Sequence, residues 1–268
     1  MTDHYAVIGN PIAHSKSPLI HQMFAEQTAQ DMRYEAILAP LDGFAETLDH
    51  LRNAGYRGCN VTVPFKFEAF NCATEISERA RAAQAVNTLQ FRGAAIFADN
   101  TDGAGLVRDM QHNLAVNLHS KQVLLLGAGG AAYGVVLPLL RAGAIITVVN
   151  RSADKAQQMA AAFMQHGKIT ANNYLSLAGR QFDVVINATS SGLSDEMPAL
   201  PMGIFASSAL AYDMMYGRDT PFLKFSRAQG ATRISDGLGM LVEQAAESFT
   251  LWRGLRPDTD AVLKKLRA

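Results

Sequence analysis

Residues 123–132 read VLLLGAGGAA, and this short stretch decides the fold. Its first four residues form a continuous apolar run, as expected for a strand buried on both faces of a sheet. The following residues fit the G-x-G-x-x-G/A fingerprint, with Gly127, Gly129 and Ala132 at its three fixed positions. There the first glycine allows a tight turn, the second lets the backbone approach a pyrophosphate, and the third position stays small for helix–strand packing. The stretch therefore predicts a dinucleotide site.

The remaining loop residues are small as well, namely Ala128, Gly130 and Ala131. A helix is expected to start here and to run to about residue 142, with its free N–H groups and positive dipole end facing the phosphates. A glycine-rich turn that only joins two elements is the alternative interpretation. The apolar strand before the loop and the helix after it favour the binding site.

The end of the next expected strand, residues 145–149, distinguishes the two nicotinamide cofactors. An NAD site usually carries Asp or Glu there, to hold the ribose 2′-OH. This chain has no carboxylate at that place and reads Asn150-Arg151-Ser152, with Lys155 about one helical turn beyond. Arg151 can stack on adenine and pair with a 2′-phosphate, so the pattern predicts NADP. The alternative is that the two cations are solvated and that Ser152 only caps a helix.

Outward from this stretch, short β-rich runs alternate with helical runs, which is typical of parallel sheets flanked by helices. Strands are expected at residues 5–8, 34–38, 58–63, 182–186 and 209–212, and a hairpin at 86–91 and 95–98. Helices are expected at residues 44–53 and 152–166. Two further helices would begin at Ser17, as N-cap with Pro18 in the first helical position, and near Pro64. We expect an α/β protein of two domains, an N-terminal α/β substrate domain with a mainly parallel sheet and a Rossmann-type dinucleotide-binding domain. The first comprises residues 1–102 plus 238–268, the second residues 103–237, and the C-terminal helices pack back on the first domain.

The composition excludes several classes of protein. Of 268 residues, 49% are apolar and 18% charged, which suits packed cores rather than disorder. Lys plus Arg equals Asp plus Glu at 24 each, so no charge excess points to nucleic acid or a membrane surface. No apolar run is long enough for a membrane helix, and no secretory signal is visible. The two cysteines are too few for a disulfide framework or a zinc site, so we expect a cytoplasmic protein.

Three polar segments follow expected strands of the first domain, at the sheet edge where open α/β sheets bind ligands. In the first, the hydroxyls of Ser15 and Ser17 could bind an anion at a helix start, although Ser17 alone is more simply an N-cap. The second places Lys66 at the head of a helix, where a cation is unfavourable, which suggests a function. The third holds Asp102 in a turn that enters a helix, where it could also be a cap.

Together, Lys66 and Asp102 could form the acid/base couple that a carbonyl reduction needs, because a cofactor delivers the hydride and the protein must supply a proton. A carboxylate beside the lysine would orient it. Further polar candidates are Asn87, Tyr216 and Gln244, each uninformative alone. The histidines lack metal-ligand spacing, and no metal is expected.

These segments together resemble the shikimate dehydrogenase family over nearly the whole chain. The matching motifs are GNPIAHSKSP (9–18), NVTVPFK (60–66), AVNT (85–88), DNTDG (99–103), GAGGA (127–131), NRS (150–152), INATSSG (186–192), YDMMY (212–216) and DGLGMLVEQAA (236–246). The resemblance implies NADPH-dependent, reversible reduction of 3-dehydroshikimate to shikimate, a step toward the aromatic amino acids. We expect small-molecule partners only and a monomer or homodimer, and the two domains would be expected to close over the substrate.

The resemblance also implies a role for each matched residue. Lys66 would be the proton donor and acceptor, with Asp102 beside it. Ser15 and Ser17 would hold the substrate carboxylate, and its ring hydroxyls or carboxylate would be contacted by Thr62, Asn87, Tyr216 and Gln244. For the cofactor, Gly127 to Ala131 would hold the pyrophosphate, Asn150, Arg151, Ser152 and Lys155 the 2′-phosphate end, and Met214 and Gly237 the nicotinamide half, with Glu78 approaching the cofactor.

Three positions depart from the family pattern. Lys155 stands where many members carry Arg, Ala132-Tyr133 where relatives often have Ser-Arg, and Gln84 where Gly is common. Lys155 weakens the expected discrimination of the 2′-phosphate, because a lysine is a point charge without the planar fork of arginine. Ala132-Tyr133 leaves the cofactor phosphates without a basic neighbour. Two alternatives stay open: an NAD-dependent quinate/shikimate dehydrogenase, which the Asn150-Arg151 pair argues against, and a non-catalytic dinucleotide sensor, which could dispense with Lys66 and Asp102.

Overall fold

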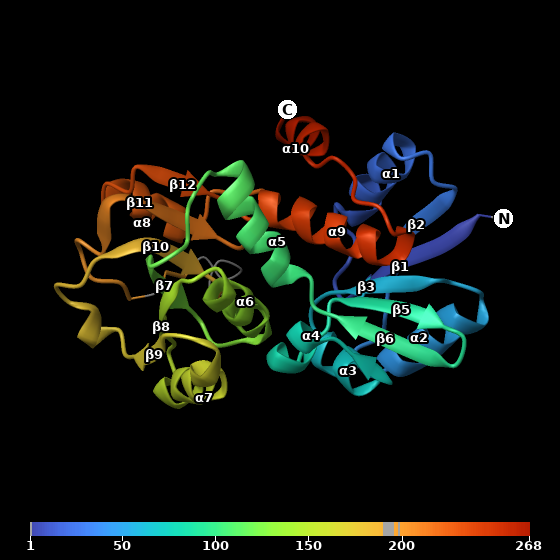
Figure 1. Ribbon diagram of the computed structural model, residues 1–268, viewed down its shortest axis with the longest axis horizontal. Coiled ribbons are helices and arrows are strands. Elements are labelled where there is room, and N and C mark those ends of the chain that lie inside the picture. The colour runs from blue at the N-terminus through green and yellow to red at the C-terminus, as the bar shows by residue number, and fades with distance from the viewer. Residues whose placement is uncertain (1, 190–195, 198) are drawn as a thin grey trace. The chain divides into compact units, whose positions relative to one another are not determined.

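The computed structural model describes residues 2–189, 196–197 and 199–268, and the chain divides into two compact units (Figure 1). Unit 1 comprises Met1–Leu106 and Leu241–Ala268, and unit 2 comprises Val107–Met240. The divisions fall inside helices α5 (Asp102–Arg108) and α9 (Leu238–Arg253). Residues 190–192 of the INATSSG motif lie outside the described residues.

Unit 2 is built on a six-stranded sheet in which every pair is parallel. Its strands are β7 (Gln122–Leu126), β8 (Ile145–Val149), β9 (Ile169–Asn172), β10 (Phe182–Asn187), β11 (Phe205–Asp213) and β12 (Arg233–Ser235). They lie in the order β12-β11-β10-β7-β8-β9, which in chain order reads 6-5-4-1-2-3. This is the doubly wound order of dinucleotide-binding folds, so the predicted Rossmann-type unit is confirmed.

Helices connect β7 to β8, β8 to β9 and β11 to β12, as is usual for parallel strands. They are α6 (Gly130–Arg141), α7 (Ala153–Phe163) with a 3-10 turn at Met164–His166, and α8 (Pro221–Ala228), while a π-helical turn at Asp109–Asn113 continues α5. Helix α8 starts where the Thr220 hydroxyl accepts the Leu223 N–H, and it buries Phe222 and Leu223 among residues of β7, β10 and β11. The apolar run of β7 is fully buried, as its sequence predicted.

Unit 1 has a mixed six-stranded sheet in the order β2-β1-β3-β5-β6-β4. Its strands are β1 (Asp3–Gly9), β2 (Met32–Leu38), β3 (Gly58–Val61), β4 (Glu75–Ile76), β5 (Thr88–Arg92) and β6 (Ala95–Asp99). The pairs β1/β2, β1/β3 and β4/β6 are parallel, whereas β5 runs antiparallel to β3 and β6. The sheet is therefore mainly parallel, and the predicted hairpin is present as β5 and β6.

Helices cover both faces of this sheet. They are α1 (Ser17–Gln27), α2 (Phe44–Asn53), α3 (Lys66–Asn71), α4 (Glu78–Ala83), α9 and α10 (Asp260–Arg267). Ile8 of β1 belongs to a core shared with Phe44 of α2, whereas Tyr5, which faces the other side, stacks on Trp252 of α9 with ring centroids 4.6 Å apart. The Trp252 indole also donates to the Leu89 carbonyl. The C-terminal helix thus packs back on the first unit, as predicted.

Two local expectations were wrong. Lys16, not Ser17, occupies the N-cap of α1, and the Ser15 hydroxyl accepts the Ser17 N–H at 3.3 Å. Strand β3 ends at Val61 and α3 begins only at Lys66, because a turn closed by Phe65 N–H to Thr62 carbonyl separates them. The turn leaves Lys66 at the helix start.

Gln84, at the C-terminus of α4, has a left-handed backbone with φ +48°. For a residue with a Cβ, that conformation costs about 1–2 kcal/mol, which explains why a glycine suits this position. We expect Gln84→Gly to raise the free energy of unfolding by about 0.5–1 kcal/mol in urea titrations. The helical neighbour provides the control, since Ala83→Gly is expected to lower stability by about 1 kcal/mol. A Gln84→Gly variant less stable than the parent contradicts this account.

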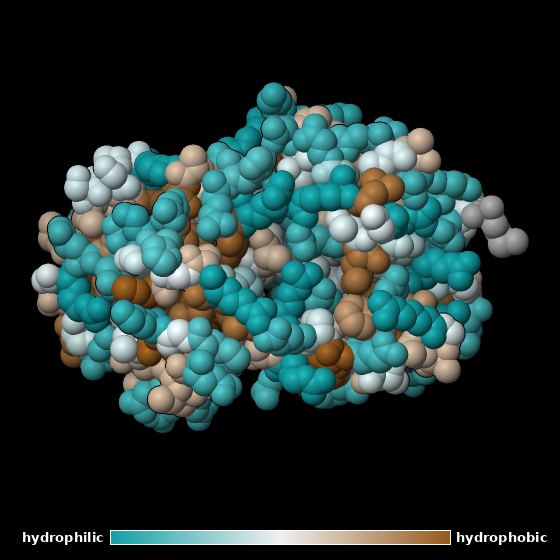
Figure 2. All heavy atoms as spheres, in the orientation of Figure 1, coloured by the Kyte–Doolittle hydropathy of each residue, from teal (hydrophilic) through white to brown (hydrophobic). Residues whose placement is uncertain are grey.

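The visible surface in Figure 2 is mainly hydrophilic, and hydrophobic residues occur there in separated groups. Among the residues that the structure describes, no helix combines the length and the apolar character of a membrane span. The described residues also hold no cluster of three or more potential metal-ligating side chains.

Candidate active site

Lys66 and Asp102 form a direct ion pair within unit 1. Each is the first residue of its helix, and the Lys66 Nζ lies 2.5 Å from Asp102 Oδ2. Their side chains are only 17% and 9% exposed, so solvent and salt screen the pair less than a surface contact. The geometry holds an ammonium group in place with one carboxylate oxygen, while the lysine keeps further N–H donors for a ligand.

Asn87, just before β5, fixes the second oxygen of Asp102. Its amide nitrogen lies 2.8 Å from Asp102 Oδ1, 2.9 Å from Thr101 Oγ1 and 3.2 Å from Gln244 Oε1. Its side-chain carbonyl oxygen accepts the Thr101 N–H at 2.8 Å. An amide NH₂ has only two hydrogens for these three acceptors. A ligand can therefore donate to Gln244 Oε1 while Asn87 still donates to Asp102 Oδ1.

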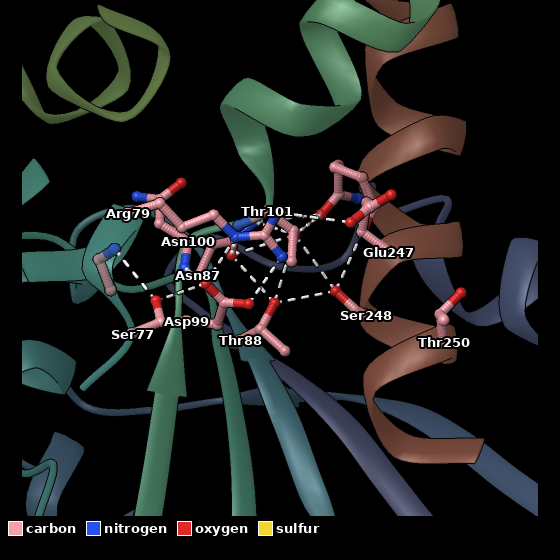
Figure 3. A network of polar contacts seen from close by, with 12 residues as sticks. Ser77, Arg79, Asn87, Thr88, Asp99, Asn100, Thr101, Glu247, Ser248 and Thr250 are labelled. Carbon is pink, nitrogen blue, oxygen red and sulfur yellow. Dashed lines mark hydrogen bonds and ion pairs between the residues drawn. The ribbon is translucent and has the colours of Figure 1, made fainter. Parts of the chain in front are cut away.

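A buried polar network supports Asn87 from the side of the sheet. The Asn60 amide nitrogen of β3 lies 3.0 Å from the Asn87 backbone carbonyl oxygen, 3.0 Å from Thr88 Oγ1 and 2.9 Å from Ser248 Oγ. Tyr34 in turn donates its hydroxyl to Asn60 Oδ1 at 2.7 Å. Figure 3 shows Thr88 and Ser248 joined beside Asn87, where β-strand ends meet α9. Because each group has partners, the network can rigidify the site.

Helices α5 and α9 touch backbone to backbone where they carry Asp102 and Gln244. A Cβ built at Gly105 would lie 2.6 Å from the Gln244 nitrogen, closer than real Cβ atoms come. Only a glycine therefore permits this approach. The contact fixes the helix that carries Asp102 against the helix that carries Gln244, and it sets the spacing between the two side chains.

The serine and threonine candidates lie on the loops after β1 and β3. These loops are neighbours, since Asn10 N–H donates to the Val63 carbonyl at 3.0 Å and Gly9 packs against the Thr62 methyl group. Ser15 and Ser17 share one turn at the start of α1, where Ser17 is buried. Their position suits a carboxylate ligand, because the free N–H groups of an 11-residue helix start there.

In unit 2, the glycine loop leaves β7 at the point where the strand order reverses. Gly127 has a left-handed φ of +106°, and a Cβ there would lie 3.1 Å from the Ala188 carbonyl at the end of β10. A Cβ built at Gly129, by contrast, meets no described atom within 4 Å. That open space lies at the N-terminus of the 12-residue helix α6, over Ala128, Gly130 and Ala131. The loop therefore fits a dinucleotide pyrophosphate.

The predicted 2′-phosphate residues follow β8. The Asn150 amide donates to the Ser152 carbonyl at 3.1 Å, which holds the turn. Ser152 is the N-cap of α7, yet its side chain makes no capping hydrogen bond. Arg151 and Lys155 are both exposed. Burial raises the pKa of the nearby Tyr174, and the positive charge of Arg151 opposes that rise. The turn presents cations and a hydroxyl, which suits a phosphate ester.

Met214 and Gly237 contact each other beyond the end of β11. The Met214 N–H donates to the Asn187 carbonyl at 3.0 Å, and the Gly237 N–H donates to the Met215 carbonyl at 2.9 Å. A Cβ at Gly237 would lie 2.2 Å from the Met214 carbonyl oxygen, so this close backbone contact requires a glycine at position 237. Tyr216 follows on the same loop and is half-buried.

The structure thus brings Lys66, Asn87, Asp102 and Gln244 into one hydrogen-bonded group in unit 1. Thr62 lies in the turn before α3, and Glu78 is an exposed residue in the first turn of α4, also in unit 1. The sequence analysis assigned no role to the supporting polar residues. Five of them lie in motifs that it quoted, namely Asn60, Thr88, Asp99, Asn100 and Thr101, and the others are Arg79, Glu247 and Ser248. Like Lys66, Arg79 is a cation in the first turn of a helix, but the sequence analysis did not predict that helix.

Comparison with known proteins gives a consistent result along the chain. A family model described as the shikimate dehydrogenase substrate binding domain matches residues 7–89, one described as shikimate / quinate 5-dehydrogenase matches residues 109–194, and one described as the shikimate 5′-dehydrogenase C-terminal domain matches residues 237–267. The chain is 62% identical to a protein of Aromatoleum aromaticum named shikimate dehydrogenase (NADP(+)), over 99% of this chain and 97% of that protein.

Solved structures agree with this similarity. An Ael1 enzyme from Pseudomonas putida has 47% sequence identity and a TM-score of 0.93, over 99% of this chain and 98% of that one. Shikimate 5-dehydrogenase from Thermus thermophilus, solved in complex with NADP(H) and shikimate, has 32% identity and a TM-score of 0.89, over 99% of each chain. Both similarities extend over both units.

Proposed function

Because this chain belongs to the shikimate dehydrogenase family, we propose that it catalyses the NADPH-dependent, reversible reduction of 3-dehydroshikimate to shikimate, an oxidoreductase step toward the aromatic amino acids. The observation that carries the proposal for this chain is the 2.5 Å contact between Lys66 and Asp102. A carbonyl reduction needs a proton donor at the oxygen, and this pair supplies one in a site that otherwise offers neutral hydrogen-bonding groups.

Lys66 and Asp102 act as the acid/base couple. When bound, NADPH supplies the hydride to the carbonyl carbon. Lys66 donates a proton to the carbonyl oxygen as negative charge develops there, and it takes the proton back from the hydroxyl in the reverse direction. Asp102 holds the ammonium group in position through Oδ2, and Asn87 keeps that carboxylate from rotating through Oδ1.

The substrate is held by neutral groups around this couple. Ser15 and Ser17 bind its carboxylate at the start of α1. The ring hydroxyls or carboxylate are contacted by Thr62, Asn87, Tyr216 and Gln244. The support for these roles is the common loop of the two serines and the direct contact between Asn87 and Gln244.

The cofactor binds to the second domain, residues 103–237, and the substrate to residues 1–102 plus 238–268. Gly127, Ala128, Gly129, Gly130 and Ala131 hold the pyrophosphate, Asn150, Arg151, Ser152 and Lys155 the 2′-phosphate end, and Met214 and Gly237 the nicotinamide half, with Glu78 approaching it. The support is the open space at Gly129 and the carboxylate-free end of β8.

We place the enzyme in the cytoplasm, as a monomer or homodimer, where its free cysteines stay reduced.

The direct test is a spectrophotometric assay of NADPH formation from shikimate and NADP. We expect turnover with shikimate, and initial rates with NADP well above those with NAD at equal concentration. Quinate with NAD is the parallel reaction to measure. Faster turnover of quinate with NAD would favour the quinate/shikimate alternative, and no turnover with any pair of compounds would refute the proposed activity.

Arg151→Ala is expected to raise KM for NADP by about 10- to 100-fold, with little change in kcat, because a charge-assisted pair with a phosphate contributes about 1.5–3 kcal/mol. NAD is the internal control, since it lacks the 2′-phosphate, and its kinetics should stay within about twofold of the parent's. An equal rise in KM for both cofactors would instead mean that Arg151 holds a part that they share.

A further inference from the structure

Arg79, which is not one of the predicted site residues, forms an ion pair with the buried carboxylate of Asp99 at the end of β6. Its Nε and Nη2 each lie 2.7 Å from one oxygen of Asp99, so the guanidinium fork holds both oxygens at once. Asp99 is 5% exposed, and its Oδ1 also accepts the Ser77 hydroxyl at 2.6 Å and the Asn100 N–H at 2.7 Å. Figure 3 shows these side chains converging on Asp99. With this many donors, Asp99 has a single defined orientation.

Asp99 and its neighbour Asn100 make the hydrogen bonds that place Asn87 and Asp102. The Asp99 backbone carbonyl accepts the Asn87 N–H at 3.1 Å, and the amide side chain of Asn100 next to it donates to the Ala85 carbonyl at 2.9 Å. The same Asn100 side chain accepts the Asp102 N–H at 3.2 Å. Asp99, which Arg79 holds, therefore contacts Asn87 directly and Asp102 through Asn100.

Arg79 also reaches the helix that carries Gln244. Its Nη1 lies 3.4 Å from Glu247 Oε2 on α9, and Glu247 follows Gln244 by three residues, on the same side of the helix. A second arginine, Arg256, also pairs with Glu247 and in addition with Glu243. Of these two arginines, Arg79 is thus the one that touches the turn before Asp102 and α9 together.

We propose that Arg79 is a positioning residue for the reaction, which through Asp99 holds Asp102 and Asn87 in the geometry that Lys66 requires. The inference rests on the proposed function of Lys66 and Asp102. Its physical basis is the planar fork, which a point charge cannot reproduce, and the burial of Asp99, which leaves a carboxylate without its main partner when the guanidinium is removed. A shift of the turn by about 1 Å is enough to slow a reaction by about 10²-fold.

The test compares kcat and KM of Arg79→Gln with the parent enzyme in shikimate oxidation. We expect kcat to fall by about 10- to 100-fold, whereas KM for NADP stays within about twofold, because the cofactor loop lies on other elements. Arg79→Lys should recover part of the lost kcat, since it keeps the charge and one of the two contacts. Asp99→Asn should lose as much as Arg79→Gln, and the double variant should lose no more than either.

Arg256→Gln is the matched control. It removes an arginine that pairs with the same Glu247, yet does not touch Asp99. We expect it to lower thermal stability while kcat stays within about twofold. Equal losses of kcat in Arg256→Gln and Arg79→Gln, or a kcat for Arg79→Gln and Asp99→Asn near that of the parent, would overturn the inference.

The two proposals fail separately. A parent enzyme without shikimate oxidation refutes the proposed function. A parent enzyme that is active, and in which Lys66 is needed while Arg79 and Asp99 are not, refutes only the positioning role. Should Arg79→Gln fold poorly, Arg79→Lys and Asp99→Asn carry the same comparison.

Discussion

Replacing Lys66 with methionine is expected to lower kcat for shikimate oxidation by about 10²–10⁴-fold, the usual contribution of one acid/base group. Methionine keeps an unbranched, flexible stem and removes the ammonium group that lies 2.5 Å from Asp102. Without it, no group accepts the proton of the reacting hydroxyl, and the negative charge that develops on that oxygen has no cation beside it. KM for shikimate should change much less, because the serines, Asn87 and Gln244 remain to bind the ring.

Lys224→Met is the control for the loss of a cation, since Lys224 is an exposed residue of α8. It should have parental kinetics. The role assigned to Lys66 is wrong if its variant keeps near-normal kcat. A rise in KM alone would also contradict it, because that pattern assigns Lys66 to substrate binding rather than to proton transfer.

The second large effect concerns stability in acid and comes from His21. Its ring is fully buried, stacks on Tyr34 at 4.1 Å, and has no hydrogen-bond partner for either nitrogen among the described residues. Burial lowers the pKa of His21 from 6.5 to about 3, a shift that the nearby Asn60 side chain opposes. His21 is therefore neutral in the folded protein above about pH 3.

The unfolded chain binds a proton at His21 below about pH 6.5, whereas the folded chain does not bind it until about pH 3. Protonation thus favours unfolding, and stability that is complete above pH 6.5 is lost progressively as the pH falls toward 3. From about pH 7 to about pH 4, this one group lowers the free energy of unfolding by about 3 kcal/mol. That is a large part of the stability of an ordinary domain.

We expect His21→Phe to remove this loss, because phenylalanine fits the surrounding aromatic rings and does not titrate. Urea unfolding of the protein, followed at about pH 7 and about pH 4, should show a decrease about 3 kcal/mol smaller in the variant than in the parent. The difference between the two proteins is the relevant quantity, since carboxylates titrate in both. Equal decreases would show that His21 is protonated or solvated in the folded state.

The Rossmann-type unit could be predicted because its signal is local. The apolar run of β7, the glycine loop and the start of α6 are contiguous in sequence, and each has a distinct physical cause. Several of the elements that were not predicted are short. Strand β4 has two residues, β12 three and α4 six, so they lack a periodic pattern, and they form because tertiary neighbours pair with them.

For the site, the sequence identified the charged pair but not what holds it. Lys66 and Asp102 attracted notice because each occupies an unusual or capping place at a helix start. Asn60 and Ser248, by contrast, are ordinary polar residues 188 positions apart, and nothing near either one indicates the other. Arg79 lies in the first turn of α4, a helix that was not predicted, and its partner Asp99 lies on another element and becomes visible only in three dimensions.

Unit 1 is assembled from two separate stretches of chain, which has a consequence during protein synthesis. When residue 240 has left the ribosome, the Rossmann-type sheet has all its strands, but the N-terminal sheet still lacks α9. Tyr5 and Phe24 then have no Trp252 or Phe249 to cover them, and the nascent chain exposes an aromatic face. Unit 2 can therefore finish folding before unit 1. A chain that stops before α9 would expose this aromatic face and would be prone to aggregate.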